Sequence, residues 1–260
     1  MKMNVIRAFF MAFSMYSRVP MPKVEWNEEN RRYALCFFPL VGVICGGLLI
    51  LWQYLCGLLG FNDLLFAAGA CTIPVIVCGG IHLDGYCDTC DALASCGDKE
   101  KKLKIMKDSH IGAFGAIMLA VYFVLQLGFF SMTNSIETVL VPAVCYVLSR
   151  SLSAIAASSF RPAKETGLLN DFAKMRSRSG VLITSVVYSA AAWLAIVLIS
   201  PPAALATLIA AALSLLIYRV TAYKHFGGVT GDLAGWFLQV CELMLLGSVV
   251  LSYSIMEAVF

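Results

Sequence analysis

Apolar and polar stretches alternate along this chain on the scale of a membrane's thickness. Seven apolar segments are each long enough to cross a hydrocarbon core of about 30 Å as an α-helix. The pattern therefore predicts an all-α, polytopic membrane helix bundle with about seven transmembrane helices in a single membrane-embedded domain, residues 1–260. The predicted spans are residues 37–59, 63–81, 113–131, 138–158, 180–200, 202–220 and 233–255.

A shorter apolar segment, residues 5–16, precedes the first predicted span. It is too short to cross a bilayer and contains Arg7, so we expect an amphipathic helix lying in the membrane interface. No small-residue cleavage site follows it, which argues against a cleavable signal peptide.

The basic residues indicate an orientation. Lys and Arg are frequent in residues 1–36 and in the loops at 82–112 and 161–180, and they are absent from residues 60–62 and 132–137. By the positive-inside rule, the basic side faces the cytoplasm, which places the C-terminus outside. We expect a multi-pass protein of the bacterial cytoplasmic (inner) membrane, with the lipid bilayer as a partner. The net charge of +3 is spread over several loops and does not indicate a nucleic-acid partner.

The most informative polar feature follows the second predicted span. Asp84, Asp88 and Asp91 are spaced by four and three residues, which places them on a helical stripe roughly 60° wide. No Lys or Arg is interleaved with them, and Mg²⁺ bound by carboxylates and substrate phosphates is the usual means of neutralising such a stripe. We therefore predict that these three aspartates are metal ligands. The alternative is a solvated acidic helix face.

Two further polar motifs lie on the same predicted side. In the first, Lys107 precedes Asp108 and Ser109, either of which could cap the third span and leave a helix N-terminus for phosphate. The alternative is a simple cap with a basic flank. In the second, residues 227–232, three glycines and Thr230 would let backbone N–H groups approach an anion. Asp232 is either a further metal ligand or an N-cap.

Two charged residues fall inside predicted spans. Arg150 and Glu242 each lie about ten residues from the cytoplasmic end, or roughly 13–15 Å deep. Ionisable groups at this depth are costly and usually face a cavity or each other. One interpretation is a buried ion pair that orders the bundle, and the other places Arg150 on a substrate phosphate. The two interpretations are compatible.

Most of the ten cysteines lie in apolar runs, where a free cysteine behaves as a small hydrophobic residue. Cys87 and Cys90 form a CxxC pair, but no second ligand pair follows at a spacing typical of zinc sites. Zinc or redox chemistry is therefore the less favoured interpretation of this pair.

At these motifs the chain resembles the cobalamin synthase (adenosylcobinamide-GDP ribazoletransferase) family. The resemblance rests on three runs, at residues 79–91, 106–112 and 227–232, and it extends to residues 17–22 and 38–42. Two positions depart from the family pattern, because Lys107 and His110 stand where it has arginines. Lysine keeps the charge but not a bidentate phosphate contact, and histidine is mostly neutral at pH 7.

The resemblance implies a reaction in which a hydroxyl of α-ribazole, or of α-ribazole 5′-phosphate, attacks the cobinamide-side phosphorus of adenosylcobinamide-GDP. GMP leaves, and the product is adenosylcobalamin or its 5′-phosphate. A Mg²⁺ ion would neutralise the diphosphate, and His82 or a nearby Asp would accept the proton. A homo-oligomer is compatible with this expectation. The expected catalytic residues are His82, Asp84, Asp88, Asp91 and Asp108; the substrate-binding residues are Lys107, Ser109, His110, Arg150, Gly227, Gly228, Thr230 and Asp232; the metal ligands are Asp84, Asp88, Asp91 and Asp232.

Two other classes of protein deserve comparison. A CDP-alcohol phosphotransferase also places Asp-Gly and later carboxylates in membrane helices, but its pattern expects Asp-Gly-x-x-Ala-Arg, and here Cys87-Asp88 follows Tyr86. A cation-coupled transporter would favour a site at the membrane midplane between paired repeats. This sequence instead gathers its carboxylates near one membrane face, and we see no repeat.

Overall fold

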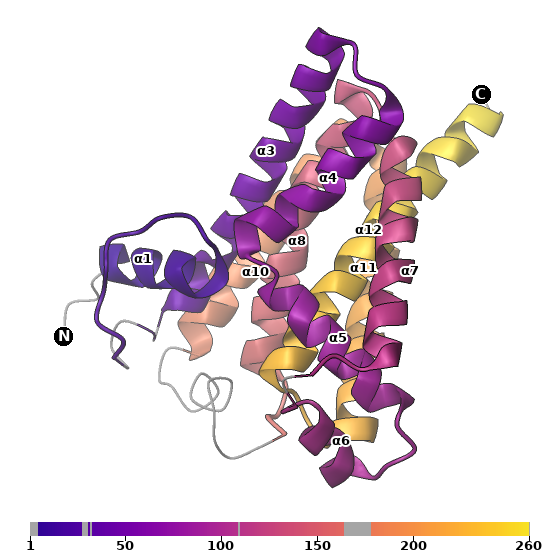
Figure 1. Ribbon diagram of the computed structural model, residues 1–260. Helices are drawn as coiled ribbons and strands as arrows, with labels where there is room; N and C mark the ends of the chain where they lie inside the picture. Colours follow the sequence, from indigo (N-terminus) through magenta and orange to yellow (C-terminus); the bar gives the residue numbers. More distant parts are fainter. Residues whose placement is uncertain (1–4, 28–30, 32, 109, 164–177, 260) are drawn as a thin grey trace.

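The computed structural model describes residues 5–27, 31, 33–108, 110–163 and 178–259, and these form a bundle of helices (Figure 1). The elements in chain order are α1 (Val5–Tyr16), η1 (Ala34–Phe37), α3 (Phe38–Leu59), α4 (Asp63–Cys78), α5 (Ile81–Ala94), α6 (Lys99–Ile105), α7 (Ala113–Ser131), α8 (Ile136–Ser159), α10 (Arg178–Ile199), α11 (Pro201–Thr221), the π-helical turn η2 (Ala222–Phe226) and α12 (Gly231–Val259).

The described helices confirm the predicted all-α membrane bundle. Six stretches are long and apolar enough to cross a membrane on their own, and α4 with α5 form a bent pair that would make a seventh span. The long helices run side by side along the bundle in Figure 1. The prediction of about seven transmembrane helices agrees with this count.

The second predicted span differs from the expectation of one helix over residues 63–81. The chain turns by 98° between α4 and α5. Gly79 and Gly80 both have positive φ angles, 66° and 77°, which a residue with a side chain adopts only at a cost. The Gly79 N–H donates to the carbonyl of Val75 and closes α4. Two consecutive left-handed glycines therefore end one helix and aim the next in a new direction.

Helix α8 packs most closely against α3, and glycine makes this approach possible. A Cβ atom on Gly42 would lie 2.7 Å from the carbonyl carbon of Tyr146, and one on Gly46 would lie 3.1 Å from that of Ala143. Small residues at such positions let helix backbones come close in a membrane, where packing replaces the hydrophobic effect as the driving force.

Helix α1 lies beside the bundle rather than within it, next to the start of α3 (Figure 1). Met11, Ala12 and Met15 on one face of α1 are buried, while Ile6 on the opposite face is exposed. The rings of Phe9 and Phe37 pack edge to face with centroids 5.9 Å apart. This helix has the length and the two-faced character expected of an interfacial segment.

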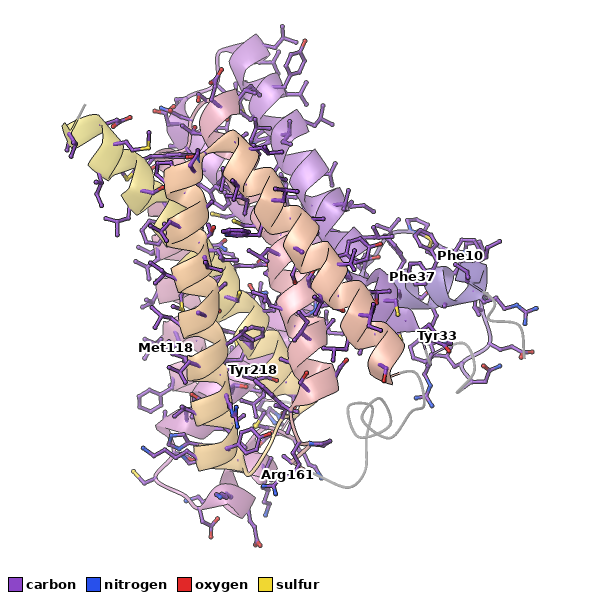
Figure 2. All side chains as sticks on the ribbon, turned by 180° about the vertical axis from the view of Figure 1, so that it is seen from behind. Phe10, Tyr33, Phe37, Met118, Arg161 and Tyr218 are labelled. Carbon is purple, nitrogen blue, oxygen red and sulfur yellow. The ribbon has the colours of Figure 1, made fainter. Side chains whose placement is uncertain are left out.

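The polar segments converge at one end of the bundle. Helices α5 and α6 and the starts of α7 and α12 lie together at the lower end of Figure 1. Figure 2 shows Arg161 at this same end. The three motifs identified in the sequence are thus brought to one end by the fold, although they are about 20 and 115 residues apart along the chain.

Candidate active site

Helix α5 carries the acidic stripe. Asp84 is exposed in its first turn, and Asp88 and Asp91 are half-buried further along. The Asp88 carboxylate lies close enough to interact electrostatically with the carboxylates of Asp84, Asp91, Asp108 and Asp232. The structure therefore gathers all five of the aspartates that the sequence singled out, and it does so from three separate parts of the chain.

Close packing of α5 against α12 places Asp232 beside the stripe. A Cβ atom on Gly85 would lie 2.7 Å from the backbone oxygen of Asp232 and 2.8 Å from its Cα. One turn further along α12, a Cβ atom on Gly235 would lie 3.0 Å from the backbone oxygen of His82. A side chain at Gly85 would clash with the backbone of α12, and one at Gly235 would require the backbone of α5 to move by a few tenths of an ångström. Gly235 was missed in the sequence because a lone glycine in an apolar helix has no distinctive signal.

Asp91 has a structural task that the sequence did not reveal. Its two carboxylate oxygens accept hydrogen bonds from the backbone N–H groups of Gly112, at 2.7 Å, and Gly115, at 2.9 Å. These bonds cap the start of α7, whose N-cap residue Gly112 offers no side chain. The expectation that Asp108 or Ser109 caps this span is therefore corrected for Asp108, and Ser109 lies outside the described residues. Each Asp91 oxygen still has a second lone pair for a cation.

Asp108 and His110 form an exposed pair beside the stripe. The His110 ring Nδ1 lies 2.8 Å from Asp108 Oδ1, and the His110 backbone N–H donates to the same oxygen at 3.1 Å. These hydrogen bonds lower the pKa of the Asp108 carboxyl below its usual value. Lys107 is exposed next to the pair. The loop thus presents a free ammonium group next to a carboxylate–imidazole pair.

The glycine-rich loop lies between η2 and α12 and is held by the end of α8. Gly227 has a φ of 79°, and the Gly228 N–H donates to the carbonyl of Ala222. Val229 exchanges backbone hydrogen bonds of 2.9 Å with Arg161 and Ala163. A Cβ atom on Gly228 would lie 2.5 Å from the carbonyl oxygen of Arg161. The backbone here is fixed by its neighbours rather than left open.

Thr230 settles which residue caps α12. Its side-chain oxygen accepts a hydrogen bond from the Leu233 N–H at 3.2 Å, and its carbonyl oxygen accepts one from the Ala234 N–H. Thr230 is therefore the capping residue. Asp232 lies in the first turn of α12, where its negative charge complements the helix dipole.

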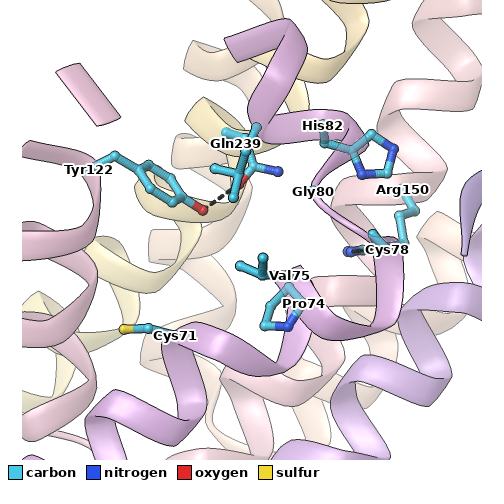
Figure 3. A pocket seen from close by; sticks show the side chains of 10 residues that line it. Cys71, Pro74, Val75, Cys78, Gly80, His82, Tyr122, Arg150 and Gln239 are labelled. Carbon is cyan, nitrogen blue, oxygen red and sulfur yellow. Dashed lines mark hydrogen bonds between the residues drawn. The ribbon is translucent and has the colours of Figure 1, made fainter. Parts of the chain in front are cut away.

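His82 lies at the start of α5, on the inner side of the break. It lines a small cavity of about 10 Å³ with Cys78, Gly80, Arg150 and Gln239 (Figure 3). This volume is about that of one water molecule. The His82 ring also packs against Phe38, with centroids 5.7 Å apart. His82 is thus half-buried on the same helix as the acidic stripe, two residues before Asp84.

Arg150 and Glu242 form the buried ion pair that the sequence offered as one interpretation. Arg150 Nη1 lies 2.6 Å from Glu242 Oε1, and the two side chains are 1% and 3% exposed. Arg150 Nη1 also donates to the carbonyl of Tyr146, and its Nη2 contacts the sulfurs of Cys45 and Cys78. The pair therefore ties α8 to α12, α3 and α4. A phosphate contact for Arg150 stays a prediction.

The carboxylates suit a hard divalent cation by their chemistry, but they do not form a complete metal cage. Among the described residues, no group of three or more His, Cys, Asp or Glu side chains is placed to hold a metal ion. Mg²⁺ usually binds through one or two carboxylates and substrate phosphates rather than in an all-protein cage. Asp84 and Asp88 are spaced one helical turn apart, and Asp88 lies within electrostatic reach of Asp232, so these carboxylates would suit a site that substrate phosphates complete.

The cysteines behave as the apolar context predicts. All ten are free thiols, and all except Cys96 are buried. Cys87 and Cys90 of the CxxC pair contribute to the hydrophobic core with Tyr86 and Trp236. This packing favours a structural role for the pair.

Together, the fold and the site define a polytopic membrane protein whose polar chemistry is concentrated at one end of a helix bundle. The chain belongs to the family described as cobalamin-5-phosphate synthase, whose model matches residues 8–250. This family assignment confirms the resemblance seen in the sequence, and it does not favour a CDP-alcohol phosphotransferase or a transporter.

The sequences of curated relatives align with this chain over nearly their full lengths. A protein of Lachnoclostridium phytofermentans named adenosylcobinamide-GDP ribazoletransferase is 42% identical over 93% of this chain and 92% of its own length. Proteins with the same name from Desulfitobacterium hafniense and Clostridium botulinum are 33% and 32% identical over 96% and 95% of this chain. They are covered over 100% and 98% of their own lengths, respectively. No solved structure matches this chain.

Proposed function

We propose that this protein transfers the adenosylcobinamide phosphate group from adenosylcobinamide-GDP to a hydroxyl of α-ribazole or α-ribazole 5′-phosphate. The bond between the cobinamide-side phosphorus and the GMP oxygen breaks, and a new phosphorus–oxygen bond forms to the acceptor. GMP leaves, and the hydroxyl proton passes to a base on the protein. The names of the relatives and the family model support this reaction.

One structural observation carries the proposal. Asp88 lies within electrostatic reach of four other aspartates, and these five come from the three segments that carry the family motifs. The stripe itself, residues 84–91, contains no Lys or Arg, and three carboxylates so close together are costly unless a cation compensates for their charge. A diphosphate substrate that brings Mg²⁺ would satisfy both the aspartates and its own phosphates.

The exposure of the aspartates and their existing contacts suggest a different role for each of them in the proposed reaction. Asp84 is exposed, and half-buried Asp88 lies within electrostatic reach of Asp232, so these residues would be the cation ligands, whereas Asp91 is equally half-buried but mainly positions the start of α7. When bound, Mg²⁺ would supply neutralisation of the diphosphate charge during the displacement. His82 or Asp108 would accept the hydroxyl proton, since both lie on segments that border the stripe.

The remaining polar residues would orient the phosphates. Lys107 is an exposed cation beside the stripe, and His110 adds charge when it is protonated. The loop of Gly227 and Gly228 lies at the same end of the bundle, and bonds from the N–H groups of Gly228 and Val229 hold its backbone in place. Displacement at phosphorus depends mostly on alignment and on charge neutralisation, which such groups provide.

We also propose that the site faces the cytoplasm in the bacterial cytoplasmic membrane. This orientation rests on the concentration of Lys and Arg at the end of the bundle that carries the site.

The reaction is tested directly with purified protein in phospholipid vesicles. Wild-type protein incubated with adenosylcobinamide-GDP, α-ribazole and Mg²⁺ should release GMP and form adenosylcobalamin in equal amounts. Release of CMP from CDP-diacylglycerol, with no GMP formed from the cobinamide donor, would point instead to a CDP-alcohol phosphotransferase.

A further inference from the structure

The break between α4 and α5 is contacted by an arginine that the proposed mechanism does not use. The backbone N–H of Arg18 donates to the carbonyl of Val77, in the last turn of α4, at 2.7 Å. The Arg18 side chain packs directly over the Cα atom of Gly79. A Cβ atom added to Gly79 would lie 2.6 Å from Arg18 Cγ and 2.9 Å from Arg18 Cδ. The absence of a side chain at Gly79 is what leaves room for the arginine.

Arg18 presents a positive charge on the outer side of the break. Its side chain is exposed, and in the part of the chain that the structure describes no carboxylate is paired with it. An arginine held at a fixed place by its main chain, with its guanidinium group unused, is suited to bind an anion from solution.

The helix that starts at the break adds to this preference. The N-cap of α5 is Gly80, in the left-handed conformation, and no side chain caps the first turn. Free backbone N–H groups and the positive end of the helix dipole favour a phosphate at such a position. The arginine and the helix start therefore attract the same kind of ligand.

The buried side of the break contains Arg150, whose guanidinium group is only partly used by Glu242 and Tyr146 among the described residues. Arg150, 1% exposed, lines the small cavity next to Gly80 and His82, and its Nε makes no hydrogen bond (Figure 3). The cavity has room for about one water molecule. The break is thus polar on its inner side and cationic on its outer side, within a bundle that is otherwise apolar.

The position of the break relates Arg18 to the acidic stripe. Asp84 lies in the first turn of α5, four residues after its N-cap Gly80, which corresponds to about 6 Å along the helix axis. We propose that Arg18 binds a phosphate group of a substrate at the α4–α5 break. This inference rests on the proposed function and adds a binding residue to it. A guanidinium group holds a phosphate through two parallel hydrogen bonds, which lysine cannot do.

Two phosphate sources share this chemistry, namely the diphosphate of the donor and the 5′-phosphate of a phosphorylated acceptor. Kinetics with three substrates separates them. A higher KM for adenosylcobinamide-GDP identifies the donor. A higher KM for α-ribazole 5′-phosphate, with none for unphosphorylated α-ribazole, identifies the acceptor.

The test uses the full-length protein in phospholipid vesicles, with Arg18→Gln and Arg18→Lys compared with wild type. Lys23→Gln is the matched control, since Lys23 is an exposed cation in the same segment. We expect Arg18→Gln to raise the KM of one phosphate-bearing substrate by about tenfold or more, the scale of a lost charge-assisted bidentate contact. Arg18→Lys should recover part of the loss, and Lys23→Gln should leave every KM unchanged.

A second variant and a binding measurement keep the result interpretable. Arg18→Met retains the stem over Gly79 and removes the charge, so it separates packing from phosphate binding. Binding of GDP to wild type and to Arg18→Met is measured directly, without turnover. Lack of GMP release by wild type would refute the proposed function alone, and GDP binding would still report on Arg18. Unchanged KM values in folded Arg18→Met, together with unchanged GDP affinity, would overturn this inference.

Discussion

Asp91 Oδ2 accepts a hydrogen bond from the backbone N–H of Gly112 at 2.7 Å, so the last carboxylate of the acidic stripe fixes the start of α7. A second bond, from the Gly115 N–H at 2.9 Å, uses the other carboxylate oxygen. The stripe is therefore divided between roles. Asp84 and Asp88 are accessible for a cation, whereas Asp91 connects the site to the scaffold.

Because Asp91 packs against the start of α7, we expect stability and turnover to be sensitive to a single methyl group added at Gly115. In Gly115→Ala the new Cβ atom would lie 2.5 Å from Asp91 Oδ2 and 2.9 Å from the backbone oxygen of Cys87. We expect the free energy of unfolding to fall by about 1–3 kcal/mol, as for other overpacked sites. Turnover should fall by about tenfold or more, because Asp91 and α5 must move.

Gly128→Ala is the matched control on the same helix. A Cβ atom there meets nothing within 4 Å. We expect unchanged turnover and a stability equal to or slightly above that of wild type, since alanine favours a helix over glycine by about 0.5–1 kcal/mol. Thermal unfolding and GMP release measure both variants, and similar behaviour of the two would remove Asp91 from its positioning role.

The Arg150–Glu242 pair predicts a compensating double variant. Arg150→Met alone leaves Glu242 buried without its partner, which should cost about 3–5 kcal/mol of stability. Adding Glu242→Leu should restore most of it. Thermal unfolding and donor binding are measured on both variants. Normal donor binding in the double variant would assign the pair to ordering the bundle, and weak binding by a well-folded double variant would place Arg150 on the substrate.

His110 predicts a pH dependence that its replacement by arginine should change. The hydrogen bonds from His110 lower the pKa of Asp108, so this carboxylate is ionised at and above its ordinary pKa. The pairing is lost only as pH falls through that lowered pKa. Near neutral pH, the Asp108 carboxylate therefore stays ionised.

If His110 contacts phosphate, turnover should weaken as pH rises through the range in which histidine loses its proton. His110→Arg should flatten that slope, because arginine remains charged. The measurement is initial rate against pH at fixed Mg²⁺ for the two proteins. Superimposable profiles would mean that His110 contributes no charge to the reaction.

The orientation can be read from a native residue. Cys96 is the exposed cysteine of the chain and lies in the segment after the acidic stripe. A membrane-impermeant maleimide should therefore label the protein in permeabilised cells and leave it unlabelled in intact cells. As a positive control, Asn134→Cys in a Cys96→Ser background places an exposed thiol at the opposite end, between α7 and α8, and should react in intact cells. The reverse pattern would contradict the cytoplasmic site.

The hydrophobic pattern was sufficient to predict the class of fold, because spans of about 20 apolar residues leave few alternatives to membrane helices. It did not predict the break after α4. The apolar run continues through Val77 and Ile81, so composition gives no reason to end the helix there. The two glycines at 79 and 80 were part of the recognised motif, but whether they turn left-handed depends on tertiary packing, including the Arg18 side chain across Gly79.

Part of the candidate site could likewise be predicted from residue spacing, and part could not. The one-face spacing of Asp84 and Asp88 and the loop before α12 could be read directly from the sequence. The hydrogen bonds of Asp91 could not, since its partners lie 21 and 24 residues away and are backbone amides, which have no signature in a sequence. The close approach of Gly85 to Asp232 could not be predicted from the sequence either, because the two residues lie nearly 150 positions apart in the chain.

Asp84 and Asp88 are proposed to hold a magnesium-bound diphosphate, and a Mg²⁺ titration of activity tests this role. GMP release from adenosylcobinamide-GDP is followed as Mg²⁺ is titrated into metal-free wild type, Asp84→Asn and Asp88→Asn. Wild type should require Mg²⁺. Each variant should lose about 10²-fold or more in turnover, the scale seen when an electrostatic catalytic group is removed, and should need more Mg²⁺ for half-maximal rate. Wild-type turnover in either variant at low Mg²⁺, or full wild-type activity in EDTA, would contradict the account.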